Sequence, residues 1–106
     1  MSSQPKLRVM ADYGSSGIWA DGDIGPFRHG MVEHADLSLP QALADAFDAW
    51  IERYWNRKEW NASELEAFNS TGRALAGELK SFAPSAVVSF QPEAWPSGVG
   101  AEELLP

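Results

Sequence analysis

Carboxylates and imidazoles gather between residues 21 and 36, and side chains of these types can bind a metal ion. The group comprises Asp21, Asp23, Glu33 and Asp36 with His29 and His34. A calcium-binding EF-hand loop needs oxygen donors at alternate positions, a central glycine and a terminal glutamate, and the stretch WADGDIGPFRHG has only part of this pattern. Zinc-binding helices place two histidines four residues apart, and His29 and His34 do not have this spacing. We therefore expect a solvated acidic loop and no metal or other cofactor. A small metal-dependent or ligand-binding module built from Asp12–Asp36 is the alternative.

Ser15 and Ser16 are the best candidates for a catalytic nucleophile, because Gly14 and Gly17 flank them. A nucleophile elbow has the form G-x-S-x-G, which this stretch lacks, and the sequence defines no acid and base that would activate a serine. The sequence also contains no P-loop and no G-x-G-x-x-G pattern. We therefore predict a binding protein that is not an enzyme, in which these glycines form a tight turn.

Aromatic side chains are the stronger functional signal. The chain has five tryptophans, and Trp50 lies on a helical apolar stripe that predicts a core position. Large amphipathic rings beside charged groups are typical of partner-binding surfaces. Three further tryptophans lie outside that stripe and have carboxylates near them in sequence, so the predicted partner-binding residues are Trp55, Trp60, Trp95, Glu52, Glu59 and Glu93. The alternative is that these tryptophans cover the open ends of the core.

Composition limits the class of partner. The chain has 106 residues and a net charge of -7, which repels nucleic acid and anionic lipid and attracts basic proteins. It contains no cysteine, so disulfides and thiolate metal sites are excluded. The start MSSQPKLRV lacks the apolar region of a signal peptide, and no apolar run is long enough to span a bilayer. We expect a cytoplasmic protein with a basic protein partner, and no nucleic acid or membrane partner.

Short strands are predicted in the first third of the chain and near its end. Residues 6–13 alternate apolar and polar side chains, and a dense turn signal follows at residues 14–17. Residues 18–20 predict a returning strand, residues 21–30 a loop, and Met31 and Val32 a third short strand. A last strand is predicted over residues 86–91, where Val88 and Phe90 share one face.

Two helices are predicted between these strands. Ser38 and Gln41 form a capping box for the first helix, with Pro40 in its first turn. Its apolar stripe consists of Leu39, Leu43, Phe47, Trp50, Ile51 and Tyr54. Either Asn61 with Glu64 or Ser63 with Glu66 caps the second helix, and Pro84 ends it. The second apolar stripe consists of Leu65, Phe68, Gly72, Leu75, Leu79 and Phe82.

These elements predict an α+β fold in the order β-β-α-α-β. We expect a small antiparallel or mixed sheet covered on one face by a two-helix hairpin. Residues 1–92 form a single domain in this interpretation, and residues 93–106 form a loosely ordered acidic C-terminal tail.

Four stretches together carry a resemblance to a known group of proteins. They are DYGSSGIW at residues 12–19, FDAWIERY at 47–54, FNSTGRALAGELK at 68–80 and VVSFQPE at 87–93. The chain resembles small bacterial proteins, some of which are encoded beside polymorphic or contact-dependent toxins and are similar to immunity proteins. The resemblance covers roughly residues 6–93. It implies an immunity-like inhibitor of a toxin or effector and supplies no catalytic residues, and the net charge of -7 predicts that this partner is basic.

The resemblance also implies fold roles for a structural signature consisting of Asp12, Tyr13, Gly14, Trp19, Gly72 and Arg73. In this interpretation Asp12 bonds the turn amides of residues 14–17, Trp19 covers the sheet, and Gly72 lets the two helices approach closely. Arg73 would pair with Asp12 or with an acid of the first helix. Two alternatives stay open: a ligand site around Asp12, Tyr13, Asn69 and Arg73, and a structural homodimer that packs through its tryptophans and Leu104-Leu105.

Overall fold

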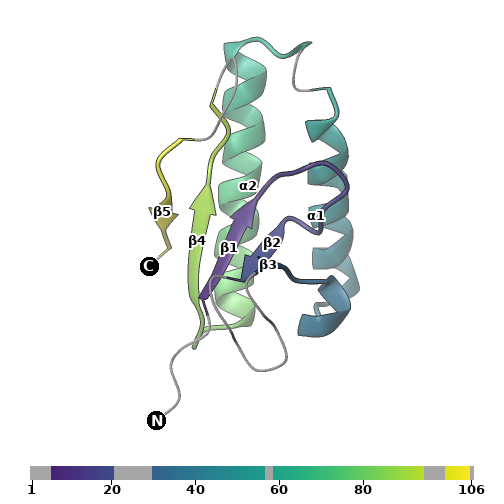
Figure 1. Ribbon diagram of the computed structural model, residues 1–106, viewed down its shortest axis with the longest axis vertical. Coiled ribbons are helices and arrows are strands. Elements are labelled where there is room, and N and C mark those ends of the chain that lie inside the picture. The colour runs from purple at the N-terminus through teal and green to yellow at the C-terminus, as the bar shows by residue number, and fades with distance from the viewer. Residues whose placement is uncertain (1–5, 21–29, 57–58, 95–99, 106) are drawn as a thin grey trace.

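The structure is a computed structural model that describes residues 6–20, 30–56, 59–94 and 100–105. In chain order its elements are the strands β1 (Lys6–Met10), β2 (Ile18–Ala20) and β3 (Gly30–Met31), the short 3-10 helix η1 (His34–Leu37), the helices α1 (Gln41–Tyr54) and α2 (Ala62–Phe82), and the strands β4 (Val87–Gln91) and β5 (Glu103–Leu104). The strands form one sheet in the order β3-β2-β1-β4-β5 (Figure 1).

The sheet is mixed, which confirms the predicted α+β class. Strand β1 is central and pairs in parallel with β4, with Val9 opposite Phe90. Every other pairing is antiparallel. A parallel pair needs a long connection between its strands, and this connection contains both helices.

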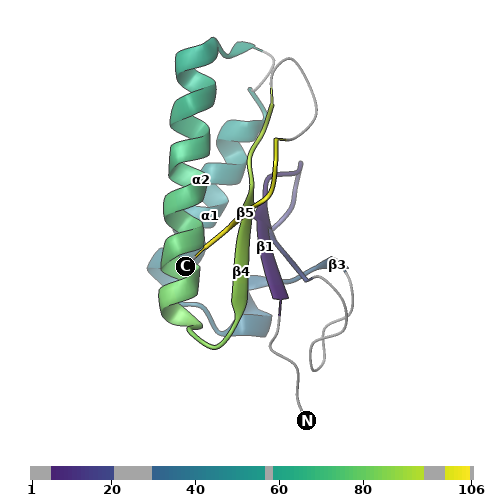
Figure 2. The ribbon, with the colours of Figure 1, turned by 90° about the vertical axis from the view of Figure 1, so that its left-hand side faces the viewer.

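Both helices lie on the same side of the sheet (Figure 2). The strands turn alternate side chains toward them, so that Leu7, Val9, Val88 and Phe90 are buried. Between the helices, the Trp50 ring stacks on Phe68 with centroids 4.8 Å apart. The Trp50 indole N–H also donates a hydrogen bond of 2.9 Å to the Phe68 carbonyl oxygen, which satisfies the polar atom of the largest fully buried side chain.

Helix α1 begins later than the sequence predicts. Ser38 does not cap it, because the residues before Ser38 form η1 and Ser38 itself ends that helix with φ of 53°. Glu33 and Asp36 close the capping box of η1 instead. Helix α1 therefore starts at Gln41 behind Pro40, without a side-chain cap.

Helix α2 begins at the first of the two predicted caps. The Asn61 side-chain oxygen accepts from the Glu64 amide at 2.8 Å, and the Glu64 carboxylate accepts from the Asn61 amide. The predicted apolar stripe is buried at Phe68, Gly72, Leu75 and Leu79. Phe82 ends the stripe and is 41% exposed, because it lies in the last turn of the helix.

Strand β5 lies within the segment 93–106, for which the sequence predicts a loosely ordered tail. Its residues pair with Ser89 and Phe90 of β4. The segment has no apolar alternation that would predict a strand. It becomes a strand because the outer edge of β4 offers backbone donors and acceptors that need partners.

The sheet face away from the helices carries a cross-strand row of Met31, Trp19, Arg8, Ser89 and Leu104. Trp19 is half-buried in this row, and its indole N–H donates to the Met10 carbonyl oxygen at 3.0 Å. Within the described residues, no helix is both long and apolar enough to cross a membrane.

Candidate functional site

Four side chains form an exposed stripe along α1. Asp45, Asp48, Glu52 and Trp55 follow one another at spacings of three, four and three residues, and all are exposed. Trp55 keeps helical backbone angles at the C-terminal end of α1, so it continues the stripe. These spacings place the four side chains on one side of a helix, opposite the buried stripe that faces the core.

The turn between β1 and β2 adds a second aromatic side chain to this stripe. Tyr13 lies with its ring centroid 4.8 Å from Trp55 and 4.7 Å from Tyr54. Tyr54 is buried, whereas Tyr13 is 40% exposed and Trp55 is 60% exposed. We call Tyr13, Asp45, Asp48, Glu52 and Trp55 the α1 outer face.

The turn that presents Tyr13 needs two glycines with positive φ, of 67° at Gly14 and 84° at Gly17. The Asp12 carboxylate accepts from the Tyr13 amide at 2.8 Å. The resemblance implied that Asp12 bonds the amides of residues 14–17. Its carbonyl oxygen accepts from the Ser15 amide at 3.2 Å, whereas the Gly17 amide donates to the Ser15 hydroxyl. Asp12 therefore fixes the position of Tyr13 at the start of the turn.

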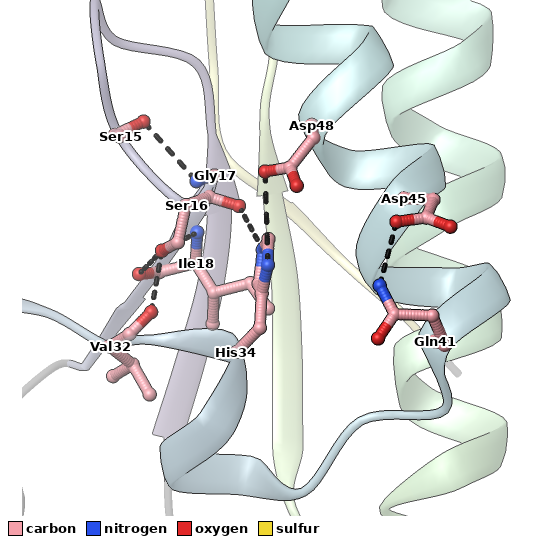
Figure 3. A network of polar contacts seen from close by, with 9 residues as sticks. All are labelled: Ser15, Ser16, Gly17, Ile18, Val32, His34, Gln41, Asp45 and Asp48. Carbon is pink, nitrogen blue, oxygen red and sulfur yellow. Dashed lines mark hydrogen bonds and ion pairs between the residues drawn. The ribbon is translucent and has the colours of Figure 1, made fainter.

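A network around His34 joins the same turn to α1 (Figure 3). His34 Nε2 lies 2.8 Å from the Ser16 carbonyl oxygen, and Nδ1 lies 3.9 Å from Asp48 Oδ1. The Ser16 hydroxyl is buried, donates to the Val32 carbonyl oxygen at 2.5 Å and accepts from the Ile18 amide. A catalytic triad needs the imidazole within reach of the serine hydroxyl, and here the imidazole faces the carbonyl instead. The network is therefore structural, and Ser16 is not an activated nucleophile.

Trp60 and Glu59 lie on a different surface from Trp55. The Trp60 ring is half-buried and packs on Phe68 with centroids 4.6 Å apart. Beside it is an open depression of about 470 Å³, lined by Arg53, Asn56, Glu59, Trp60, Glu64 and Ala67. Trp60 therefore both covers the end of the core and offers a partly exposed ring, whereas Trp55 is mainly exposed.

Glu93 is not part of an exposed acidic rim. It is only 8% exposed. Its amide and carbonyl are held by the Asn69 side chain, with Glu93 N to Asn69 Oδ1 and Asn69 Nδ2 to Glu93 O both at 3.0 Å. The pair ties the segment after β4 to α2. Trp95, the sixth predicted partner-binding residue, lies outside the described residues.

Arg73 has a different partner from those that the resemblance implied. Its Nε and Nη2 atoms donate to the two carboxylate oxygens of Glu103 in β5, at 2.7 Å and 2.8 Å. These hydrogen bonds, and to a smaller extent the positive charge, hold the pKa of Glu103 below its ordinary value. Neither Asp12 nor an acid of α1 pairs with Arg73 in the described part of the chain. Asn69 and Arg73 thus hold Glu93 and Glu103 in place.

Gly72 lies where α2 packs against α1 and β4. A Cβ atom at this position would lie 2.5 Å from both Trp50 of α1 and Phe90 of β4. Only a residue without a side chain lets α2 approach these rings so closely.

The described members of the group of acidic and histidine residues at 21–36 have separate contacts. Glu33 and Asp36 cap η1, and His34 bonds to Ser16. Asp21, Asp23 and His29 lie outside the described residues. Among the residues that the structure does describe, no group of three or more His, Asp or Glu side chains could hold a metal ion.

Sequence reasoning missed Asp45 and Asp48 as surface residues beside Glu52 and Trp55. Their spacing, opposite the apolar stripe, is visible in the sequence and could have identified them. The position of Tyr13 beside Trp55 has no such signal, because the two residues lie far apart in the chain and meet only through tertiary packing.

Comparison with known proteins assigns the chain to a family. A search of curated proteins gives no match. A family model described as Serratia CdiI immunity protein-like matches residues 5–93, which include β1 to β4 and both helices. The match confirms the resemblance to immunity proteins of contact-dependent toxin systems. The chain belongs to the Serratia CdiI immunity protein-like family.

Proposed function

We propose that this protein is a non-enzymatic inhibitor that binds and neutralises a basic toxin. The match to an immunity protein-like family over residues 5–93 is the observation that carries the proposal. An immunity protein protects a cell by occupying a toxin, so its function needs a surface for a protein partner and no chemistry of its own.

The described polar groups support binding over catalysis. Ser16, the serine nearest to an imidazole, has a buried hydroxyl engaged with backbone atoms. Asn69 and Arg73 are committed to holding Glu93 and Glu103 in place. The exposed groups of the α1 outer face are carboxylates and aromatic rings, which are suited to contact with a protein.

The basic character of the toxin follows from charge. A net charge of -7 attracts a cationic partner over distances of about 10 Å at moderate ionic strength, and attraction of this kind raises the rate of encounter. Many toxins that act on nucleic acid or on membranes must themselves carry positive charge, because their targets are anionic.

A co-expression experiment tests the proposal. A toxin domain from the C-terminus of a contact-dependent toxin is produced in a host cell with and without this protein. We expect growth arrest with the toxin domain alone, growth with both proteins, and a stable complex on size-exclusion chromatography. The C-terminal toxin domain of an unrelated system is the specificity control. Continued growth arrest in the presence of the folded protein, with no complex, would overturn the proposal.

A further inference from the structure

We infer that the α1 outer face binds a segment of the toxin that presents arginine or lysine side chains, one of which lies over the rings of Tyr13 and Trp55. The inference rests on the proposed function and adds to it the surface and the chemistry of recognition. The α1 outer face consists of Tyr13, Asp45, Asp48, Glu52 and Trp55, as defined above.

The rings of Tyr13 and Trp55 form an exposed aromatic surface that a buried ring supports. Trp55 is 60% exposed and Tyr13 40% exposed, and their centroids are 4.8 Å apart. Buried Tyr54 supports Tyr13 from the core side at 4.7 Å. A supported ring loses little freedom when a partner binds, and tryptophan and tyrosine faces attract a guanidinium or ammonium group through their quadrupoles.

Carboxylates lie next to this aromatic surface along α1. Glu52 lies three residues before Trp55, and Asp48 and Asp45 follow in the direction of the helix start. Successive members of such a stripe lie roughly 5–6 Å apart, a spacing that suits a chain of alternating basic side chains. Charge complementarity therefore selects a cationic occupant over an apolar one.

Three described cations have partners outside the stripe. Arg53 donates to Thr71 of α2 and lies over Phe68, and Arg73 binds Glu103. Lys80 donates to the carbonyl oxygens of Pro84 and Ala86. Within the stripe, Gln41 donates to Asp45 at 2.8 Å and His34 Nδ1 lies 3.9 Å from Asp48, and all three carboxylates stay exposed to a partner.

A second surface serves as the internal comparison. Glu66, Glu78 and Phe82 are exposed on α2, and Phe82 with Glu78 borders an apolar groove of about 690 Å³ between the helices. A phenylalanine ring attracts a cation less strongly than a tryptophan ring. Two carboxylates and one aromatic ring can be removed from this second surface without changing the α1 outer face. Glu66, Glu78 and Phe82 therefore provide matched controls.

The first experiment uses a tetra-arginine peptide amide as the probe and nuclear magnetic resonance of the 15N-labelled protein as the readout. We expect the largest shifts at the Trp55 indole N–H and at the amides of residues 45–55. A peptide with citrulline in place of arginine keeps the shape but loses the charge, and it should cause no such shifts. Shifts that are equal at Glu66, Glu78 and Phe82 would overturn the assignment of the surface.

The second experiment measures affinity for the toxin domain. Trp55→Ala should raise the Kd about tenfold or more, and Asp48→Asn combined with Glu52→Gln should lower the association rate on the order of tenfold at low salt. The controls Phe82→Ala and Glu66→Gln combined with Glu78→Gln should change both quantities less than twofold. Circular dichroism checks that each variant is folded.

The outcomes separate the two proposals. If the wild-type protein neither binds nor protects, the proposed function fails, and the inference fails with it. If it protects but the α1 and α2 variants lose affinity equally, the surface assignment fails and the proposed function stands.

Discussion

Gly72 shows how one residue sets the distance between three elements. It lies in α2 where the helix passes Trp50 of α1 and Phe90 of β4, and an added Cβ would come within 2.5 Å of each ring. Both rings are fully buried, so neither can move aside without disturbing the core. Gly77, five residues later in the same helix, has nothing within 4 Å of the position of its Cβ.

The two glycines predict opposite effects of the same substitution. Gly72→Ala should lower the free energy of unfolding by about 2 kcal/mol, because overpacking outweighs the gain in helix propensity. Gly77→Ala should raise it by about 0.5–1 kcal/mol, because only the propensity term applies. Urea unfolding followed by tryptophan fluorescence measures both. An unchanged or higher stability of Gly72→Ala would contradict the close approach of α2 to Trp50 and Phe90.

At the scale of elements, the C-terminal part of the chain is joined to α2 by side chains at two places. Asn69 bonds both backbone groups of Glu93 just after β4. One turn further along the helix, Arg73 binds both carboxylate oxygens of Glu103 in β5. Strand β5 is only two residues long, and these contacts add to the few backbone bonds that hold it on the sheet.

The first attachment predicts a clear loss of stability. Asn69→Ala removes two hydrogen bonds to part-buried backbone groups and should cost about 2 kcal/mol of unfolding free energy. Ser70→Ala, an exposed position in the same turn of α2, is the matched control and should change stability by less than about 0.5 kcal/mol. Equal effects of the two substitutions would show that the Asn69 attachment does not stabilise the fold.

The second attachment predicts a pH-dependent contribution. The pKa of Glu103 is held below its ordinary value of 4.5 by the hydrogen bonds from Arg73. A lowered folded-state pKa gives stability that is complete above the ordinary value and is lost as the pH falls through the folded-state value. Both side chains are partly exposed, so Glu103→Gln should cost only about 0.5 kcal/mol near neutral pH.

The measurement compares urea unfolding of wild type and Glu103→Gln at pH 7 and near pH 3. We expect the difference between the two proteins to become smaller at the lower pH, because the stability that Glu103 contributes is lost as its carboxyl takes up a proton. Glu66→Gln, which changes an exposed carboxylate of α2, the helix that carries Arg73, is the control. A difference that does not decrease as the pH falls would show that the charge of Glu103 is not its cause.

At the scale of the whole molecule, the family match implies a protein partner, and the negative charge is the basis for proposing that this partner is basic. In the proposed complex, the net charge of -7 would act on a basic toxin before contact, whereas the α1 outer face would act after contact. The association rate therefore reports on the net charge, and the dissociation rate reports mainly on the contacts of the α1 outer face.

Ionic strength separates these two contributions. Between about 0.02 M and 0.5 M salt, the rate of association with a basic toxin domain should fall on the order of tenfold or more, because the charges are screened. The dissociation rate should change much less. Stopped-flow tryptophan fluorescence measures both rates, and an association rate that is independent of salt would rule out electrostatic steering.

Sequence patterns predicted the elements that depend on neighbours in the chain. The Asn61–Glu64 cap, the buried stripe of α2 and the inward side chains of β4 each follow from spacings within one segment. The start of α1 was predicted wrongly for a local reason. A competing capping box at Glu33 and Asp36 formed η1, and η1 ended at Ser38.

What the sequence alone determined is the α+β class with its strand and helix segments, the negative charge and the resemblance to immunity proteins, because local periodicity, composition and motif stretches carry these properties. Tertiary structure decided which residues meet. It paired Arg73 with Glu103 in place of Asp12, buried Glu93, ordered β5 on the edge of β4, and brought Tyr13 to Trp55. Such contacts join residues that are distant in the chain, and they form only when the sheet and helices have packed, so no local pattern specifies them.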